Sequence, residues 1–542
     1  MGASQRPGVV FQPKAYQGMQ RGINQMVAAI RPTLGPLPRL VAIGGNGNGQ
    51  LPELLDNGAL IARRMVQLPD RDADMGAMFI RHMLWQVHEK VGDGTATTAL
   101  LFQTLYSEGV RYSVAGGNSM RLRHYLEEGM QLILAQLDRL AIAVEGKEKL
   151  AQVAESICYD PPLSKLLGEI FDIVGEYGQV DIRTGRGRGL EREYVEGMHW
   201  NSGLFSRQMI TDHLRLRTDL VDSAILISDL DLEEPGQVLP LLETTLQAGI
   251  RSLMMVAHKF SERVVALLLS ASREPDNFQV IAVKTPGLGG IDQVATLEDL
   301  AILTGGRPIV RAAGDTLKGV RLEDLGRARR VWADHHYFGI SGGKGNPGGL
   351  RSHLVQLRAA FARAASAEQG QKLQQRIGKL MGGSATLYVG GATEPEIKAR
   401  QETAQRTAAA MRGAVREGVL PGGGVALLAC QPILRERLTG CSDPDQRAAY
   451  RLLIKALETP IRTIAHNAGY EAAEVMAQIQ QAEGGYGFDV RTGQVVNMAQ
   501  AGIWDAAAVV KTAVHSAVAS AGLALSTEVL IHRRKSEESL QP

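Results

Sequence analysis

The sequence predicts an α+β multidomain protein in which an α/β middle domain is inserted into a helical domain. The chain has 542 residues, more than one ordinary hydrophobic core accommodates. Its first and last thirds carry the apolar spacing of long helices, whereas the middle third alternates short β-like runs with helical stretches. Such an insertion is physically simple, because the two termini of a domain often lie close together.

The first third is predicted to be helical. Apolar residues recur at helical spacing over 15–32, 75–91, 97–112 and 119–145. Between the first two, the stretch "LLDNGALIARR" at 54–64 is predicted as a short turn that leads from an apolar run into a helix. Asp, Asn and Gly favour turn conformations there.

The pattern changes to short β-like runs from about residue 178. These runs are "GQVDIRT", "REYVEGM", "SAILIS", "SLMMVA" and "FQVIAV". Helical stretches at 237–248 and 261–272 alternate with them, which predicts at least some parallel strand pairing. After "SATLYVGGATE" at 384–394, helical patterns return and continue almost to the end of the chain.

Composition excludes several functional classes. Hydrophobic residues make up 44% and charged residues 21%, which is typical of a globular protein. A net charge of +2 gives no reason to expect nucleic acid or a membrane as partner. Three scattered cysteines and a start without an apolar signal segment predict a cytoplasmic location. The twelve histidines form no metal-ligand or nucleophile–base pattern, which argues against a small-molecule enzyme.

The longest uncharged run, "TAVHSAVASAGLALST", contains several Ser and Thr residues and a His. We therefore predict a buried helix of small residues here and not a membrane span.

Four glycine-containing turns are candidate binding loops: "RPTLGPLPR", "VGDGTATTALL", "VLPGGGVALL" and "GGYGFDVRTG". The second is the most informative, because two glycines open a helix that begins Thr-Ala-Thr-Thr. Backbone N–H groups at a helix start bind anions, and threonine hydroxyls add donors. Asp93, between the glycines, is suited to hold a divalent cation against phosphate oxygens. An ordinary helix N-cap is the alternative interpretation.

These loops occur in an order that resembles the group I chaperonins, the GroEL and heat-shock protein 60 family. The family's Gly-Asp-Gly-Thr-Thr-Thr-Ala motif is similar to "GDGTATTA" here, and "TLGP" resembles its first phosphate loop. "VGGATEPEIKAR", "AVREGVLPGGGVALL" and "NMAQAGIWDAAAVVKTAVHSAVASAGLALSTEVLI" resemble later family segments. The resemblance covers roughly the whole chain. It implies the chaperonin fold, with a helical equatorial domain, a small intermediate hinge domain and an inserted α/β apical domain.

The resemblance also implies domain boundaries and partners. The expected parts are equatorial 1–139, intermediate 140–195, client-binding apical 196–383, intermediate 384–417 and equatorial 418–542. The expected assembly is a ring, seven-fold in the family, of identical subunits or mixed with an active paralogue. Unfolded protein clients and a co-chaperonin lid are its expected partners.

ATP and Mg²⁺ are the cofactors that the resemblance implies. Asp93 would bind Mg²⁺, and Asp505 would accept hydrogen bonds from the ribose. The full set of implied nucleotide-binding residues is Thr33, Leu34, Gly35, Pro36, Asp93, Gly94, Thr95, Ala96, Thr97, Gly423, Asp489, Val490 and Asp505.

The chain departs from the family at both catalytic carboxylates. Asn57 stands where the family has the aspartate that acts on the attacking water, and Asp56 stands where it has lysine. An alignment without gaps places Arg406 at the second acidic position. Asn can orient a water but cannot take its proton, so we expect slow or absent hydrolysis.

Four alternatives remain open at this stage. A one-residue slip could place Asp56 at the catalytic position, since the preceding loop "GGNGNGQ" is about two residues longer than usual. Glu402, four residues before Arg406, could substitute on the same helical face. Arg406 could instead pair with a phosphate and stabilise bound nucleotide. A ring that kept the chaperonin shape without client work is the rival from another functional class.

The resemblance places a client-binding surface on two apical helices, 237–249 and 261–273, and on the segment 203–209. Apolar stripes of this kind are usually core, and the family geometry is what favours exposure. The implied client-binding residues are Leu204, Met209, Leu239, Leu242, Leu246, Val265, Leu268 and Leu269. The family's Gly-Gly-Met tail is replaced by "HRRKSEESLQP", so we expect reduced contact between tail and client.

Overall fold

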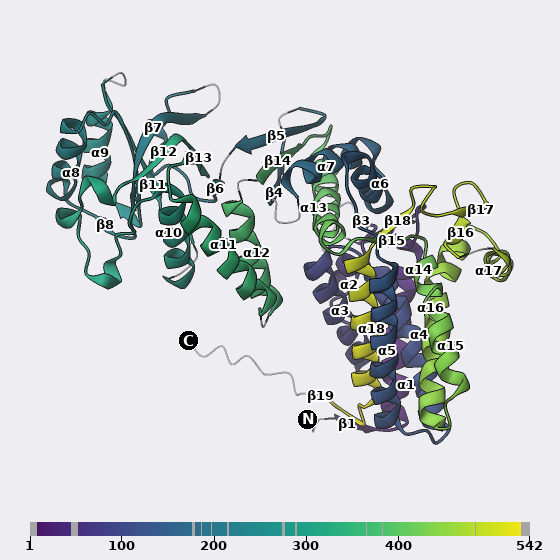
Figure 1. The fold of residues 1–542 in the computed structure, drawn as a ribbon. Coiled ribbons are helices and arrows are strands. Elements are labelled where there is room, and N and C mark those ends of the chain that lie inside the picture. Colours follow the sequence, from purple (N-terminus) through teal and green to yellow (C-terminus); the bar gives the residue numbers. More distant parts are fainter. Residues whose placement is uncertain are drawn as a thin grey trace. The chain divides into compact units, whose positions relative to one another are not determined.

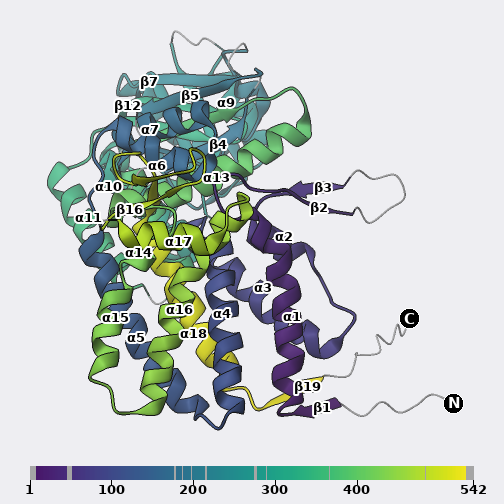
Figure 2. The same cartoon turned by 90° about the vertical axis from the view of Figure 1, so that its right-hand side faces the viewer.

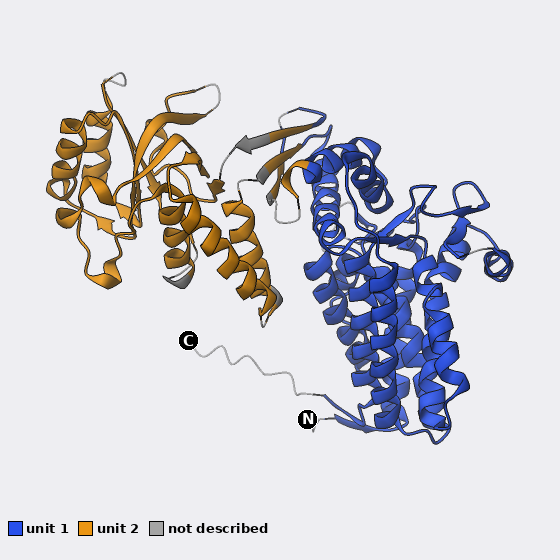
Figure 3. Ribbon diagram, in the orientation of Figure 1, with its two compact units in different colours: residues 1–172, 184–190, 389–542 blue, residues 173–183, 191–388 orange. Residues whose placement is uncertain are grey.

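The chain forms two compact units in this computed structural model. The structure describes residues 8–44, 52–175, 179–185, 187–196, 198–213, 216–273, 277–287, 290–364, 366–381, 383–482 and 484–532. The first unit combines 1–172, 184–190 and 389–542, and the second combines 173–183 and 191–388 (Figure 3). The second unit is therefore inserted into the first, as the change of pattern along the sequence predicts.

The first unit is built mainly of helices, and the long ones among them lie side by side in a bundle (Figure 1). The helices of this unit are α1 (Lys14–Ile30), α2 (Gly58–Arg64), α3 (Arg71–Val91), α4 (Thr95–Val114), α5 (Ser119–Leu140), α6 (Lys147–Cys158), α7 (Pro161–Val174), α13 (Glu394–Glu417), α14 (Val425–Leu428), α15 (Gln431–Thr439), α16 (Pro444–Asn467), α17 (Ala472–Gln481) and α18 (Ala507–Leu525). Helices from both ends of the sequence pack together, with α4 and α5 against α16 and α18.

Helix α18 is the predicted buried helix of small residues. It is long and apolar enough to cross a membrane by length and composition alone, yet 61% of the relevant window is buried inside the protein. Its Ala and Val residues pack into the same core as α4 and α5. Burial against these helices accounts for its apolar composition, because small side chains allow close helix packing.

Short strands join distant parts of the first unit. β1 (Gly8–Phe11) pairs antiparallel with β19 (Val529–His532), so the two ends of the described chain lie side by side (Figure 2). The other pairs are β2 (Val41–Ile43) with β3 (Glu53–Leu55), β15 (Val419–Pro421) with β18 (Trp504–Ala506), and β16 (Tyr486–Asp489) with β17 (Gln494–Asn497).

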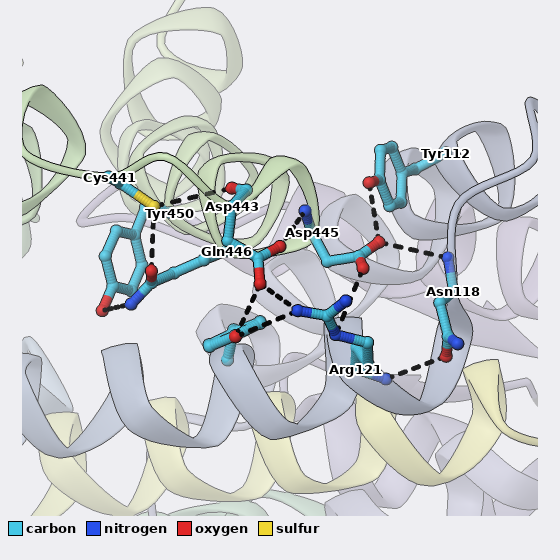
Figure 4. Close-up of polar contacts among 9 residues, drawn as sticks. Tyr112, Asn118, Arg121, Cys441, Asp443, Asp445, Gln446 and Tyr450 are labelled. Carbon is cyan, nitrogen blue, oxygen red and sulfur yellow. Dashed lines mark hydrogen bonds and ion pairs between the residues drawn. The ribbon is translucent and has the colours of Figure 1, made fainter.

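A polar cluster fastens the start of α16 to the α4–α5 turn (Figure 4). The buried carboxylate of Asp445 accepts hydrogen bonds from the Tyr112 hydroxyl at 2.8 Å and from the Asn118 backbone N–H at 3.2 Å. Arg121 contacts both Asp443 and Asp445. Burial, followed by the bond to Asp445, raises the pKa of Tyr112 to about 12, so the phenol stays a neutral donor. The cluster joins segments that are more than 300 residues apart in the chain.

The second unit is built around a six-stranded sheet in the order β11–β9–β7–β12–β13–β6. Its strands are β6 (Met198–Trp200), β7 (Arg217–Ile227), β9 (Ser252–Ala257), β11 (Gln279–Lys284), β12 (Gly326–Asp334) and β13 (Phe338–Gly343). β7, β9 and β11 are parallel, as the strand–helix alternation predicts, whereas β12, β13 and β6 are antiparallel to their neighbours.

Helices pack on this sheet, and further strands complete the chain between them. The helices are α8 (Pro235–Gln247), α9 (Glu262–Ala271), α10 (Gly290–Thr304), α11 (Pro347–Ala362) and α12 (Ala367–Leu380). β8 (Asp231–Leu232) pairs with β10 (Lys259–Phe260). A three-stranded sheet, β4 (Gln179–Thr184), β14 (Gly383–Val389) and β5 (Leu190–Glu196), forms where the chain passes between the units. Whether the hinge is a domain of its own stays a prediction.

Candidate functional site

The first unit contains a cavity of about 580 Å³ at the ends of several helices and loops. All the residues that the chaperonin resemblance assigns to nucleotide binding border this cavity: Thr33, Leu34, Gly35, Pro36, Asp93, Gly94, Thr95, Ala96, Thr97, Gly423, Asp489, Val490 and Asp505. Asp56, Asn57 and Arg406 border it too. The fold thus brings four loops that are widely separated in sequence around one space.

The Gly-Asp-Gly turn presents the start of α4 to the cavity. Gly92 and Gly94 have φ angles of +73° and +80°, which residues with a side chain rarely adopt. A Cβ on Gly92 would lie 2.5 Å from the carbonyl oxygen of Arg406. The tight turn frees the first N–H groups of the 20-residue helix α4, and Thr95 beside them is 4% exposed. A helix start of this length favours an anion.

The loop after α1 borders the cavity beside α16. The hydroxyl of Thr33 donates to the carbonyl of Ile30 at 2.8 Å. The side-chain amide of Asn467, the last residue of α16, donates to the carbonyls of Arg31 and Leu34 at 2.8 and 2.9 Å. These bonds hold the loop in one conformation, with Gly35 at a φ of +110°.

One end of the cavity is apolar. Phe488, Val490 and Met498 belong to a buried hydrophobic cluster, and Ile464 packs against it. The carboxylate of Asp489 already makes hydrogen bonds within the β16–β17 turn, where it accepts from the Arg491 backbone N–H at 2.9 Å and from the Thr492 hydroxyl at 3.0 Å. Such a surface suits a flat, apolar group such as a nucleobase.

Asp93 and Asp505 place two carboxylates near one another. Asp505 lies on β18, opposite Leu420 of β15. Burial raises the pKa of Asp505 to about 7, and the charge of Asp93 adds to the shift. Carboxylates that repel one another in this way are favourable surroundings for a cation. The described residues contain no cluster of three or more metal-ligating side chains, so a metal here would take further ligands from phosphate and water, as Mg²⁺ does.

Tyr159 also borders the cavity, although no motif of the resemblance includes it. It ends α6 with a φ of +52°. The Arg491 guanidinium lies 5.2 Å from the centre of its ring. Burial and the carboxylates of Asp93 and Asp505 raise its pKa. The sequence "YDPP", whose two prolines are the first residues of α7, is the helix-boundary signal at this residue.

Asn57 and Asp56 lie at the charged end of the cavity. Asn57 is 4% exposed and caps α2, since its side-chain oxygen accepts from the N–H groups of Ala59 at 2.9 Å and Leu60 at 3.2 Å. The Cβ that Gly58 lacks would lie 3.0 Å from the Thr95 hydroxyl. The start of α2 therefore lies directly against the start of α4.

Arg406 faces this pair of residues from α13. Its Nη2 donates to Asp56 Oδ2 at 2.7 Å, and its side chain is only 13% exposed. Its Nε atom is buried without a hydrogen-bond partner among the described residues. The two positions that carry carboxylates in the resembled family thus carry an amide and a guanidinium here, and the guanidinium binds the neighbouring aspartate.

Glu402 lies one helical turn before Arg406, outside the cavity lining that the described residues form. Desolvation and the nearby carboxylates of Glu53 and Asp56 raise its pKa. The loop "GGNGNGQ", on which the one-residue slip depends, lies almost wholly outside the described residues, as does the tail after His532.

The implied client-binding residues divide into two groups in the second unit. Leu239 and Leu246 on α8 are 44% and 47% exposed, and Val265 and Leu269 on α9 are half-buried. The others, Leu204, Met209, Leu242 and Leu268, are at most 4% exposed and lie in the core. On α8 the difference arises from the orientation of the helix, whose face toward the core carries Val238, Leu241, Leu242 and Thr245.

The geometry of cavity and fold agrees with a comparison to known proteins. The model of the TCP-1/cpn60 chaperonin family matches residues 26–535. This chain belongs to the TCP-1/cpn60 chaperonin family. The chaperonin resemblance and the α+β multidomain fold predicted from the sequence are both confirmed.

Solved chaperonin structures share the fold. The chain is similar to the chaperonin gp146 from the bacteriophage EL 2 (Pseudomonas aeruginosa), crystallised in the presence of ATP-BeFx. The TM-score is 0.71 at 19% identity for crystal form I and 0.65 at 20% for form II. In both cases 97% of this chain and 99% of gp146 are covered. Family and fold together support a chaperonin-like role in protein folding.

Proposed function

We propose that this chaperonin is a cytoplasmic ring subunit that binds ATP with Mg²⁺ and captures non-native polypeptides, with little or no ATP hydrolysis. The observation that carries the proposal is the single cavity that all the implied binding loops border, with an amide and a guanidinium at the two catalytic positions. The ring is formed by identical subunits or is shared with an active paralogue, and a co-chaperonin lid remains an expected partner.

The cavity supports nucleotide binding through complementary ends. The apolar end accommodates the base, and the start of α4 with Thr95 offers N–H and hydroxyl donors to phosphates. Six carboxylates and two guanidinium groups border the cavity, so a bare triphosphate would be repelled. Asp93 is the residue that fits Mg²⁺, and the bound ion would neutralise phosphate charge. Asp505 would accept the ribose hydroxyls.

The charged end supports slow hydrolysis. The oxygen of Asn57 already accepts two backbone N–H groups, and an amide has no capacity to take a proton from water. Loss of a general base typically lowers a rate by about a hundred- to ten-thousand-fold. Arg406 supplies no carboxylate in compensation.

The rival proposal is an ATP-hydrolysing foldase that uses Asp56 or Glu402. The contact between Asp56 and Arg406 opposes it, because Asp56 Oδ2 is already an acceptor for the guanidinium. Glu402 is also unsuited as it stands, because it lies outside the described cavity lining. A structural ring without client work is the second rival, and client capture separates it from the proposal.

Phosphate release by the purified assembly tests the proposal, alongside direct binding of ATP with and without Mg²⁺. We expect Mg²⁺-dependent binding with negligible turnover. Turnover at the rate of an active chaperonin would overturn the hydrolysis part, and its loss in Asp56→Ala would identify Asp56 as the base. Failure to bind ATP at all would overturn the nucleotide part.

A further inference from the structure

Arg406 is a cation at the charged end of the cavity with unused hydrogen-bonding capacity. A guanidinium carries five N–H donors. Nη2 binds Asp56 at 2.7 Å, while the buried Nε has no partner among the described residues. A buried donor without a partner is costly to the folded protein. A ligand that brought acceptor oxygens to this position would therefore be bound favourably.

The position of Arg406 is fixed relative to the phosphate turn. The backbone of α13 approaches Gly92 so closely that a Cβ there would lie 2.5 Å from the Arg406 carbonyl and 2.7 Å from the Ala409 Cβ. The start of α2, which Asn57 caps, contacts Thr95. Asp56, Thr95 and Arg406 therefore lie together at the charged end of the cavity, whose lining also contains Phe488 and Val490 of a separate apolar cluster.

A nucleotide that lies along this cavity places its outermost phosphate at the charged end. The base occupies the apolar end, and the first phosphates reach the start of α4. A diphosphate ends there, whereas a triphosphate extends one phosphoryl group further, toward Asp56 and Arg406. Arginine is suited to this group, because its planar fork binds phosphate oxygens in pairs.

We propose that Arg406 recognises the third phosphate of ATP. Its guanidinium leaves Asp56 and binds this terminal phosphate, so the site binds ATP more tightly than ADP. The inference rests on the proposed nucleotide binding and adds a specificity-determining residue to it. Asp56 acts as an internal competitor, because its carboxylate holds the guanidinium when the third phosphate is missing. The same carboxylate also repels a triphosphate.

The two residues then have opposite effects on selectivity. Arg406→Ala removes a charge-assisted contact with the third phosphate only, so ATP affinity falls about ten- to hundredfold while ADP affinity stays within about twofold. Arg406→Lys keeps the positive charge but lacks the planar guanidinium, so its ATP affinity should lie between those of the wild type and Arg406→Ala. Asp56→Asn removes the competitor and the repulsion, so ATP affinity rises and ADP affinity is little changed.

Isothermal titration of the purified assembly with Mg²⁺-ATP, Mg²⁺-ADP and a non-hydrolysable ATP analogue tests the inference. Arg416→Ala is the matched control, since it removes an arginine of the same helix that contacts Glu417 outside the described cavity lining. This control should bind both nucleotides like the wild type. Circular dichroism checks that each variant is folded.

Wild-type protein that binds neither nucleotide overturns the proposed function and this inference with it. Wild-type protein that binds both, combined with an Arg406→Ala variant that weakens both equally or neither, overturns this inference alone. If Arg406→Ala does not fold, Asp56→Asn decides: a higher ratio of ATP to ADP affinity supports the inference, and an unchanged or lower ratio overturns it.

Discussion

Arg406 contributes to the pKa shifts of two nearby groups. His88, in the last turn of α3, is half-buried, and its Nδ1 has no hydrogen-bond partner among the described residues. Burial, and then the charge of Arg406, lower the pKa of His88. Cys158 lies near the same guanidinium, but burial dominates there and raises the pKa of the thiol to about 11. For both groups the charge of Arg406 is secondary to burial, and it lowers the pKa in each case.

Restoring both acidic side chains should restore hydrolysis. In Asn57→Asp combined with Arg406→Asp, a carboxylate can again accept the proton of the attacking water. We expect phosphate release to rise at least about tenfold, since a positioned general base contributes about a hundred- to ten-thousand-fold. Aspartate caps a helix as well as asparagine does, so α2 should be retained.

The single variant Asn57→Asp is the control for that double change. Arg406 remains opposite the new carboxylate in this variant, so its turnover should stay below that of the double variant. A double variant that binds ATP but releases phosphate no faster than the wild type would show that these two positions do not limit hydrolysis.

His88 should make the protein sensitive to mild acid. Its pKa lies below the usual 6.5 in the folded protein, so below about pH 6.5 the unfolded chain binds the extra proton first. The free energy of unfolding is therefore fully retained above this pH and falls as the pH drops toward the folded pKa. His88→Gln should lose less Tm than the wild type between about pH 7.5 and 5.5. Equal losses in both proteins would contradict the argument.

At the scale of elements, α8 offers the most accessible apolar side chains of the implied client surface. Leu239 and Leu246 are two helical turns apart and 44% and 47% exposed. Leu239→Ser with Leu246→Ser should abolish suppression of aggregation of a denatured substrate, because apolar contact with the client is lost. Stability should change little, since neither side chain lies in the core.

Val355→Ser is the control for this pair. Val355 is 63% exposed on α11 of the same unit, which lies apart from α8 and α9 (Figure 1). It should capture clients like the wild type. Loss of capture in the control as well, or full capture by the α8 variant, would count against a client surface on α8.

The helices were predictable where apolar periodicity was long. Those expected at 75–91 and 97–112 are α3 and α4 with small shifts at their ends. The one expected at 119–145 stops at Leu140, because Ile142 instead exchanges backbone hydrogen bonds with Val419 at 2.9 and 2.8 Å. A pairing between residues so far apart leaves no local pattern, so tertiary contact overrode the periodicity.

The cavity was predictable from motif order, but its internal contacts were not. Glycine-rich turns are visible in the sequence because close approach and positive φ restrict the residue type. The contact of Asp56 with Arg406 spans 350 residues and follows no motif. The burial of Leu242 and Leu268 was equally unpredictable, because an amphipathic pattern does not show which apolar residues of the helix the core covers.

At the scale of the whole molecule, the cavity belongs to one of the two units. All its described lining residues lie in the first unit. ATP with Mg²⁺ at about a hundred times its Kd should stabilise that unit by about 2.7 kcal/mol and leave the intrinsic stability of the second unit unchanged. Calorimetry combined with hydrogen exchange should show slower exchange in α4 and α16 and no such change in β9 and β11. Equal protection in both units would contradict this expectation.

The pairing of α4 with α18 has a consequence during synthesis of the chain. α18 begins at Ala507, 393 residues after α4 ends at Val114. Ribosomes add about 5 to 20 residues per second, so α4 waits roughly 20 to 80 s for the helix that covers it. Meanwhile the part of α4 that packs against α18 lacks that native cover. A protein of the chaperonin family therefore itself needs its apolar surface shielded while it emerges from the ribosome.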